Sequence, residues 1–246
     1  MIYTKAKNTC LLITGCIRPD YRVPILSVTD ETVRRRQYID SIRYYISSTK
    51  YQNIIFCDNS CSKPEEGLIL LAEKKEKQFE WISFVGNSEM TIKQGKGYGE
   101  GEIIEYAMKH SKILHHCKTI VKVTGRLLIH NIDWCLLLNG EKYAYFDISP
   151  NYIDTRLYIT PVLFYNANLI EAYKRVNDNE NVYLEHVFFN VLKGKEKCIR
   201  QIPFYVNISG QSGSQGLYYQ KVGFINLLCK STKKIIKGII IRLRMK

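Results

Sequence analysis

Short apolar runs alternate with helix-type periodicity through the first half of the chain, and this alternation limits the fold more than any other feature. Residues 10–13, 53–57 and 119–123 are rich in apolar side chains in series, which is typical of strands buried on both faces. Residues 30–47 repeat apolar side chains at helical spacing, with Arg34–Arg36 expected to point outward. The alternation predicts an α/β fold with a mostly parallel central sheet and helices on both faces.

The rest of the chain continues this pattern less regularly. Residues 94–100 read QGKGYGE, which predicts a Gly-rich turn carrying a lysine that feeds the next helix; a mobile surface loop is the alternative. Residues 209–216 have the composition of a loop that closes over a ligand, or of a plain connector. We expect further strands at 81–85, 143–148, 157–164 and 198–205, and helices at 64–77, 102–110, 167–176 and 183–192.

The positive charge is concentrated at the C-terminus. The formal net charge is +13, yet residues 221–246 contain eight Lys or Arg and no Asp or Glu, which leaves 28 basic and 23 acidic residues in the body. Apolar residues interleave with these cations, as in helices that lie at a membrane surface. We therefore expect a main domain at 1–220 and a basic amphipathic tail at 221–246 that associates with a membrane. A terminal helix packed on the body is the alternative.

The composition also suggests where the protein acts. No apolar run approaches the roughly 20 residues that a membrane span requires, and residues 1–9 lack a signal-peptide pattern. The eight cysteines are scattered without a CxxC pair and several lie in apolar strands, which predicts buried thiols in a reducing compartment. These features predict a cytoplasmic protein that is peripheral on the inner face of the cell membrane.

Polar and cationic residues cluster where the expected strands end. Ligands of open α/β sheets bind beyond the carboxyl ends of the strands, and glycines and cations favour phosphate. Asp58 directly follows a buried strand and can accept hydrogen bonds from a base or a ribose, or can simply form a turn. The candidate ligand-binding residues are Thr14, Gly15 and Arg18; Asp58, Asn59 and Ser60; Lys96, Gly97 and Gly99; and Lys122, Thr124, Gly125 and Arg126.

The order of these motifs resembles a known family. Cys10–Arg18 followed by Ile54–Ser60 resembles the opening of GT-A-type nucleotide-sugar glycosyltransferases, with bacterial capsule and O-antigen enzymes most similar. The resemblance implies a GT-A-like fold, a nucleotide-sugar donor and a lipid-linked oligosaccharide acceptor. Tyr183–Phe189 resembles the late acidic motif that supplies the base in inverting members, which implies Glu185 in that role. His186 is its neighbour, and Asp154 is a third option.

One departure from the family concerns the metal. The fourth strand of the family usually ends in Asp-x-Asp, which holds a divalent cation, whereas no Asp-x-Asp occurs in this chain and the strand here reads Ile120–Arg126. Arg and Lys can also neutralise a diphosphate leaving group. We hypothesise that Lys96, Lys122 and Arg126 replace the metal. The sequence requires no cofactor, and Mg²⁺ or Mn²⁺ remains the alternative.

Two other classes of function stay open. The basic tail and the 18 tyrosines are compatible with a nucleic-acid-binding protein. Because the cations sit on an apolar segment and no recognition motif is present, we expect no nucleic acid as a partner. A catalytically inactive transferase-like protein that only binds an assembly partner is the third reading.

Overall fold

The core of the protein is a seven-stranded sheet. The computed structural model describes residues 2–24, 26–213 and 216–244, with side chains placed for 4–24, 26–213 and 216–236. The strands lie in the order β3-β2-β1-β4-β7-β6-β8. Their bounds are β1 Thr9–Gly15, β2 Asn53–Asp58, β3 Gln78–Ser83, β4 Thr119–Thr124, β6 Ala144–Ile148, β7 Ile153–Pro161 and β8 Ile199–Gln201.

The strand directions confirm the mostly parallel sheet. β1 pairs in parallel with β2 and with β4, β2 pairs in parallel with β3, and β6 in parallel with β8. β7 runs antiparallel to both of its neighbours, β4 and β6. The carboxyl ends of β1, β2 and β4 therefore meet at one edge, where the amino end of β7 also lies.

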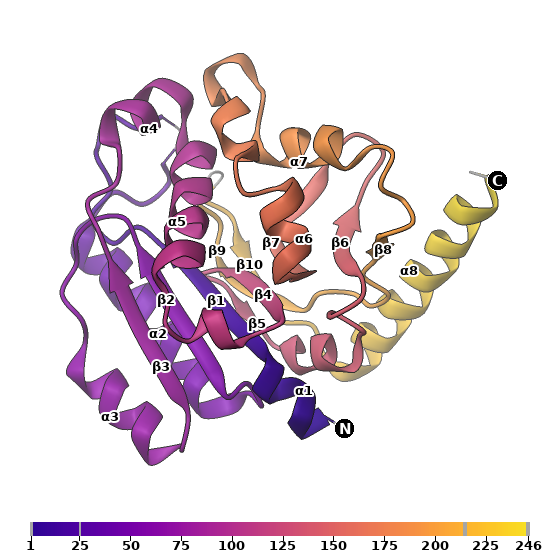
Figure 1. The fold of residues 1–246 in the computed structure, drawn as a ribbon, viewed down its shortest axis with the longest axis horizontal. Coiled ribbons are helices and arrows are strands. Elements are labelled where there is room, and N and C mark those ends of the chain that lie inside the picture. The colour runs from indigo at the N-terminus through magenta and orange to yellow at the C-terminus, as the bar shows by residue number, and fades with distance from the viewer. Residues whose placement is uncertain (1, 25, 214–215, 245–246) are drawn as a thin grey trace.

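Helices cover both faces of the sheet, as predicted, and each face has its own apolar core (Figure 1). α2 and α3 pack on one face, where Tyr38, Ile42 and Tyr45 of α2 are buried. α5, α6 and α7 pack on the other. The helices are α1 Ile2–Asn8, α2 Glu31–Ser48, α3 Glu66–Lys74, α4 Ser88–Gln94, α5 Lys96–His110, α6 Val162–Asn168, α7 Leu184–Leu192 and α8 Phe224–Arg244, with 3₁₀ turns η1 Leu114–His116, η2 Ile132–Leu137, η3 Ala172–Arg175 and η4 Asp178–Glu180.

The Gly-rich segment is a helix rather than the predicted turn. α4 ends at Gln94, Gly95 adopts a φ of 97°, and α5 begins at once with Lys96. Glycine is a poor helix former, but a Cβ on Gly101 would lie 2.0 Å from the Cβ of Tyr173. Close packing of α5 against η3 thus explains Gly101, while Gly95 and Gly97 pack against Asp178 and Gly99 packs against Asn59 and Thr91.

Three other predicted elements differ from the structure. The strand expected at 157–164 is β7, which ends at Pro161, and α6 follows directly. The helix expected at 167–176 is the end of α6 and the turn η3. The strand expected at 198–205 is reduced to the three residues of β8, because its carboxyl half leaves the sheet to reach α8.

A small second sheet and α8 complete the fold. The order of this sheet is β10-β9-β5, with bounds β5 Leu128–Ile129, β9 Ile208–Gln211 and β10 Tyr218–Tyr219. The turn-rich segment 209–216 therefore contains most of β9; its residues 214–215 lie outside the described part. Gly210 in β9 has a φ of 116°, and a Cβ there would lie 2.7 Å from the carbonyl oxygen of Arg126.

α8 lies along the β6 and β8 side of the molecule (Figure 1). It contacts the body through a narrow stripe, in which Leu227 and Ser231 are buried and the Lys234 ammonium donates to Asp147 Oδ2 at 2.6 Å. The expected amphipathic tail also contains Ile239, Ile240, Ile241 and Leu243, whose side chains lie outside the described part of the chain. Within the residues described, no helix is long and apolar enough to span a membrane. All eight cysteines are free thiols, but the expected burial holds only for half of them: Cys10, Cys57, Cys117 and Cys135 are buried, Cys16 is half-buried, and Cys61, Cys198 and Cys229 are exposed.

Candidate active site

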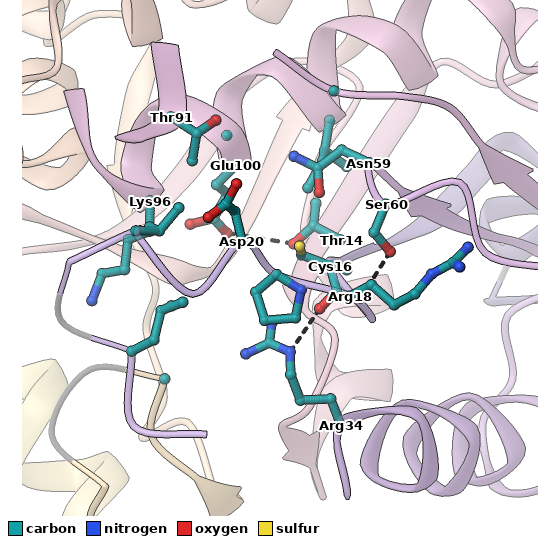
Figure 2. Close-up of a pocket in the computed structure, with 18 of the residues that line it drawn as sticks. Thr14, Cys16, Arg18, Asp20, Arg34, Asn59, Ser60, Thr91, Lys96 and Glu100 are labelled. Atoms are coloured by element: carbon teal, nitrogen blue, oxygen red, sulfur yellow. Dashed lines mark hydrogen bonds between the residues drawn. The ribbon is translucent and has the colours of Figure 1, made fainter. Parts of the chain in front are cut away.

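A cavity of about 420 Å³ opens at the edge where β1, β2 and β4 end (Figure 2). We call it the edge cavity. Its size lies within the range of small-molecule sites. It is lined by Thr14, Gly15, Cys16, Arg18, Pro19, Asp20, Val23, Leu26, Arg34, Tyr38, Asn59, Ser60, Cys61, Val85, Gly86, Ser88, Thr91, Lys96, Gly99, Glu100, Ile103, Thr124, Arg126 and Gly213.

Two arginines of the edge cavity are almost completely buried. Arg34 is 4% exposed and Arg126 is 8% exposed. The Arg34 guanidinium donates to the carbonyl oxygens of Cys16 at 2.8 Å and Val28 at 2.9 Å, and Arg126 Nη1 donates to Gln37 Oε1 at 3.0 Å. Burial lowers the pKa of Arg126. In the described part of the chain, the arginines that form ion pairs are Arg18, Arg22, Arg35, Arg43 and Arg156.

These two guanidinium groups therefore meet neutral oxygens rather than carboxylates within the described chain. A buried cation is costly unless an anion accompanies it. Arginine also presents a planar fork of donors that matches phosphate oxygens. The arrangement fits a cavity whose missing anion comes from a ligand.

Glu100 supplies a carboxylate to the edge cavity, and Lys122 lies beneath it. Lys122 is fully buried; its ammonium forms an ion pair with Glu100 and donates to the carbonyl oxygen of Thr155 at 2.7 Å. Thr14 and Thr124 donate to the same Glu100 oxygen at 3.4 and 3.3 Å. This corrects the expected position of Lys122: it belongs to the supporting layer and does not line the cavity, because β4 is covered on both faces.

The amino end of α5 is capped by the protein itself. Gly97 N–H donates to Asp178 Oδ2 at 3.3 Å, and a Cβ on Gly95 would lie 2.3 Å from that side chain. Burial raises the pKa of Asp178. Since a carboxylate already faces the amino end of the helix, the expected phosphate site there is not open. Lys96 lines the edge cavity, and burial lowers its pKa.

Asp58 holds the surrounding loops together. It is fully buried and does not line the edge cavity, although the neighbouring Asn59 and Ser60 do. The expectation that this carboxylate faces a ligand is therefore wrong. Groups of the protein itself, at the junction of β1, β2 and β3, donate hydrogen bonds to it. It accepts hydrogen bonds from Ile17 N (2.8 Å), Ser60 N (3.1 Å), Ser60 Oγ (2.8 Å), Ser62 N (3.2 Å) and Ser83 Oγ (2.9 Å).

The three candidate bases lie outside the lining of the edge cavity. Glu185, in the first turn of α7, accepts a hydrogen bond from Thr155 Oγ1 at 2.8 Å, and burial raises its pKa. Burial also acts to raise the pKa of Asp154, but hydrogen bonds and charge from Arg156 outweigh it and lower the pKa. His186 Nδ1 lies 3.1 Å from the carbonyl oxygen of Asn181, and as the next residue of the helix it projects in a different direction from Glu185.

The structure thus brings together most of the predicted ligand-binding residues. Asp58, Gly97, Lys122 and Gly125 lie behind the lining. Gly125 packs where a Cβ would lie 2.4 Å from the carbonyl oxygen of Thr14. The predicted residues that line the edge cavity are Thr14, Gly15, Arg18, Asn59, Ser60, Lys96, Gly99, Thr124 and Arg126.

Sequence reasoning missed Arg34 and Glu100. Arg34 was expected to point outward, but it lies one helical turn before Tyr38 on the buried face of α2, and that spacing was the available signal. Glu100 was read as part of a turn. Its place in the second turn of α5 becomes visible only when the segment is recognised as a helix.

Several solved structures are similar to this chain, with low sequence identity and TM-scores below 0.5. No family model and no curated protein matches the chain. Among solved structures, core-mannan synthase A of Aspergillus fumigatus in its Mn/GDP form is 10% identical, with a TM-score of 0.48 over 94% of this chain and 85% of that one. The mannosyltransferase Ktr4p of S. cerevisiae is 8% identical, with a TM-score of 0.48 over 94% and 81%.

A nucleotidyltransferase is also similar in fold. The inositol-1-phosphate CTP transferase of T. maritima is 12% identical, with a TM-score of 0.39 over 95% of this chain and 98% of that one. Sugar transferases and nucleotidyltransferases both occur among these structures.

Proposed function

We propose that the protein is a glycosyltransferase that takes a sugar from a nucleotide-sugar donor held in the edge cavity. The observation that carries the proposal is the pair of buried guanidinium groups, Arg34 and Arg126, that face this cavity without a carboxylate partner in the described chain. Arg18 and Lys96 line the same space. A diphosphate would supply the anion that Arg34 and Arg126 need, and the cavity has room for a nucleoside beside it.

The same cations would act on the leaving group. When a glycosidic bond to a nucleoside diphosphate breaks, negative charge develops on the phosphate oxygens. Donors fixed in advance stabilise that charge without reorganisation, and burial strengthens their effect. Arg126, which follows β4, keeps this role, Lys122 does not face the cavity, and Arg34 is added from α2.

The carboxylates of the edge cavity do not fit a divalent metal ion. Glu100 already pairs with Lys122, and Asp20 pairs with Arg22 at 2.7 Å. No group of three metal-ligating side chains occurs among the residues described. The proposed mechanism therefore uses the cationic side chains. EDTA should leave turnover intact; complete loss of activity that Mn²⁺ restores would contradict this part of the proposal.

The acceptor hydroxyl needs a base within hydrogen-bonding reach. Glu185 remains the first candidate, because burial raises its pKa from the ordinary carboxyl value toward neutral pH, where a general base works best. Glu100 is the candidate that the structure adds, since it lines the cavity directly. Glu185→Gln and Glu100→Gln separate the two: the true base is the position at which turnover collapses while nucleotide binding persists.

The acceptor that we propose is a lipid-linked oligosaccharide of capsule or O-antigen type at the inner face of the cell membrane. The support comes from α8, which exposes Phe224 (67%), Ile225 (77%) and Leu228 (45%) beside its lysines. Such a face would lie at the lipid boundary and meet anionic headgroups. The enzyme would then work where its acceptor lies.

A thermal-shift screen tests the donor. UDP-, GDP-, dTDP- and CMP-sugars are added in EDTA, and a ligand at a hundredfold its Kd should add about 2.7 kcal/mol of stability. The stabilising sugar nucleotide is then tested for transfer to a lipid-linked acceptor. Absence of any nucleotide effect would reject the proposal, and pyrophosphate release from a nucleoside triphosphate and a sugar phosphate would instead identify a nucleotidyltransferase.

A further inference from the structure

A second cavity, of about 480 Å³, lies between the main sheet, the small sheet and α8. It shares no lining residue with the edge cavity. Three tyrosines border it: Tyr205, Tyr218 and Tyr219. We call it the tyrosine cavity. Proteins place aromatic rings with polar tips where a ligand presents both an apolar face and hydrogen-bonding groups.

The charged groups of the tyrosine cavity are held in fixed positions. Arg156 forms an ion pair with Asp154, and its guanidinium carbon lies 5.0 Å from the Tyr219 ring centroid. Lys230 lies 4.6 Å from the Tyr205 ring centroid. Asp147 accepts hydrogen bonds from Gln201 at 2.8 Å and from Lys234. Donors and acceptors locked by their neighbours lose little freedom when a ligand binds.

The charge balance distinguishes the tyrosine cavity from the edge cavity. Asp147 and Asp154 offset Arg156 and Lys230 within the lining, so a polyanion gains little there. In the edge cavity, by contrast, the buried Arg34 and Arg126 have no carboxylate partner within the described chain. A neutral ligand with many hydroxyl groups matches the tyrosine cavity best: carboxylates accept from hydroxyls, and the C–H face of a sugar ring packs on tyrosine.

The two cavities are neighbours along one sheet edge. β4 ends in the edge cavity with Thr124, and its antiparallel neighbour β7 begins with Asp154 and Arg156 in the tyrosine cavity. The segment that carries β9 and β10 contributes to both, with Gly213 in the first and Tyr218 in the second. A ligand in the tyrosine cavity could therefore extend toward a donor in the edge cavity.

We propose that the tyrosine cavity binds neutral pyranose units of a carbohydrate, and that these units belong to the acceptor glycan. The second half of this statement rests on the proposed glycosyltransferase function, whereas the first half does not. Lys230 brings α8 into the lining, so the glycan would bind beside the exposed apolar face of that helix.

Saturation-transfer NMR with octyl β-D-glucopyranoside below its micellar concentration tests the site. Transfer to the ring protons is expected, whereas transfer confined to the alkyl chain would overturn the proposal in favour of a lipid pocket. Tyr218→Leu should weaken ring binding roughly tenfold, about 1.4 kcal/mol. Tyr218 is 69% exposed, so this change spares the fold. Tyr21→Leu, at an 83% exposed tyrosine outside both cavities, is the matched control.

The outcome also separates this inference from the proposed function. Thermal stabilisation by sugar nucleotides should be the same in Tyr218→Leu as in the wild type. Ring binding without any nucleotide effect would keep the carbohydrate site and reject the transferase. Nucleotide binding with equal ring signals in wild type, Tyr218→Leu and Tyr21→Leu would reject the site and keep the transferase.

Discussion

The ammonium group of Lys122 and the carboxylate of Glu100 form an ion pair directly beneath the edge cavity. Lys122 is fully buried, while the Glu100 side chain is 24% exposed. The pair ties β4 to α5, and the bond from Lys122 to the carbonyl of Thr155 adds β7. The lysine that interrupts an apolar strand therefore supports the floor of the cavity and fixes the direction of Glu100.

Removal of Lys122 should destabilise the protein. In Lys122→Met, Glu100 would keep its charge in a half-buried position without a cation, and breaking such a pair costs about 3 kcal/mol. Urea unfolding followed by circular dichroism measures the loss. The double variant Lys122→Met/Glu100→Gln should recover part of it, because no unpaired charge remains. An unchanged midpoint in the single variant would contradict this account.

Arg126→Met should weaken binding of the sugar nucleotide identified by the thermal screen. A charge-assisted hydrogen bond contributes about 1.5–3 kcal/mol, so the Kd should rise roughly tenfold to a hundredfold. Isothermal titration calorimetry measures it. Arg36→Met is the matched control, since Arg36 is exposed on α2 and lines neither cavity. Equal affinity in both variants would remove Arg126 from the site.

The raised pKa of Glu185 predicts a pH dependence of stability. The folded state binds this proton more tightly than the unfolded chain, so the contribution is fully present below the ordinary carboxyl pKa. It is lost as pH rises through the raised pKa. In Glu185→Gln the amide oxygen can still accept from Thr155. The variant should therefore exceed the wild type in stability at mildly alkaline pH and converge with it in acid, as unfolding curves across pH will show.

The rate of turnover should also depend on the protonation of Glu185, but in the opposite direction to stability. A general base acts when it is deprotonated, so kcat/KM should fall in acid through a pKa above the ordinary carboxyl range. Glu185→Gln should remove most of the rate, and the activity that remains should no longer fall in acid. If kcat/KM instead falls through the ordinary carboxyl pKa, or if the variant turns over normally, Glu185 is not the general base.

Two glycine substitutions should act in opposite directions. Gly101→Ala places a methyl group against Tyr173 and should destabilise the protein by about 1–3 kcal/mol. Gly67→Ala, in the exposed part of α3, meets nothing within 4 Å and should stabilise it by about 0.5–1 kcal/mol. Thermal unfolding of both variants provides the measurement. Equal shifts would mean that α5 does not depend on close packing.

Attachment to membranes should depend on the apolar face of α8. Ile225→Asp should reduce co-sedimentation with vesicles that contain phosphatidylglycerol, because it removes an apolar contact that is 77% exposed in the protein. Asn226→Asp, the next residue of the same exposed helix, adds the same charge without removing that contact. Equal losses would show that charge alone governs attachment. If the wild type itself fails to co-sediment with the vesicles, the membrane role is rejected.

The amino-acid sequence was sufficient to predict the sheet, most of its strands and the edge at which most of the candidate ligand-binding residues meet. Apolar runs such as Cys10–Ile13 can be buried only between two layers, and parallel strands bring their carboxyl ends together. Thr14, Asn59 and Arg126 could therefore be placed in one cavity from their positions at or shortly after the ends of strands.

Which charged groups line the edge cavity could not be predicted from the sequence and depends on contacts between distant segments. Lys122 and Arg126 looked equivalent in the chain, but one is buried against Glu100 and the other lines the cavity. Arg34 faces inward although its neighbours in sequence do not. Local sequence sets the periodicity of an element, whereas partners distant in the chain set which of its charges are paired and which remain for a ligand.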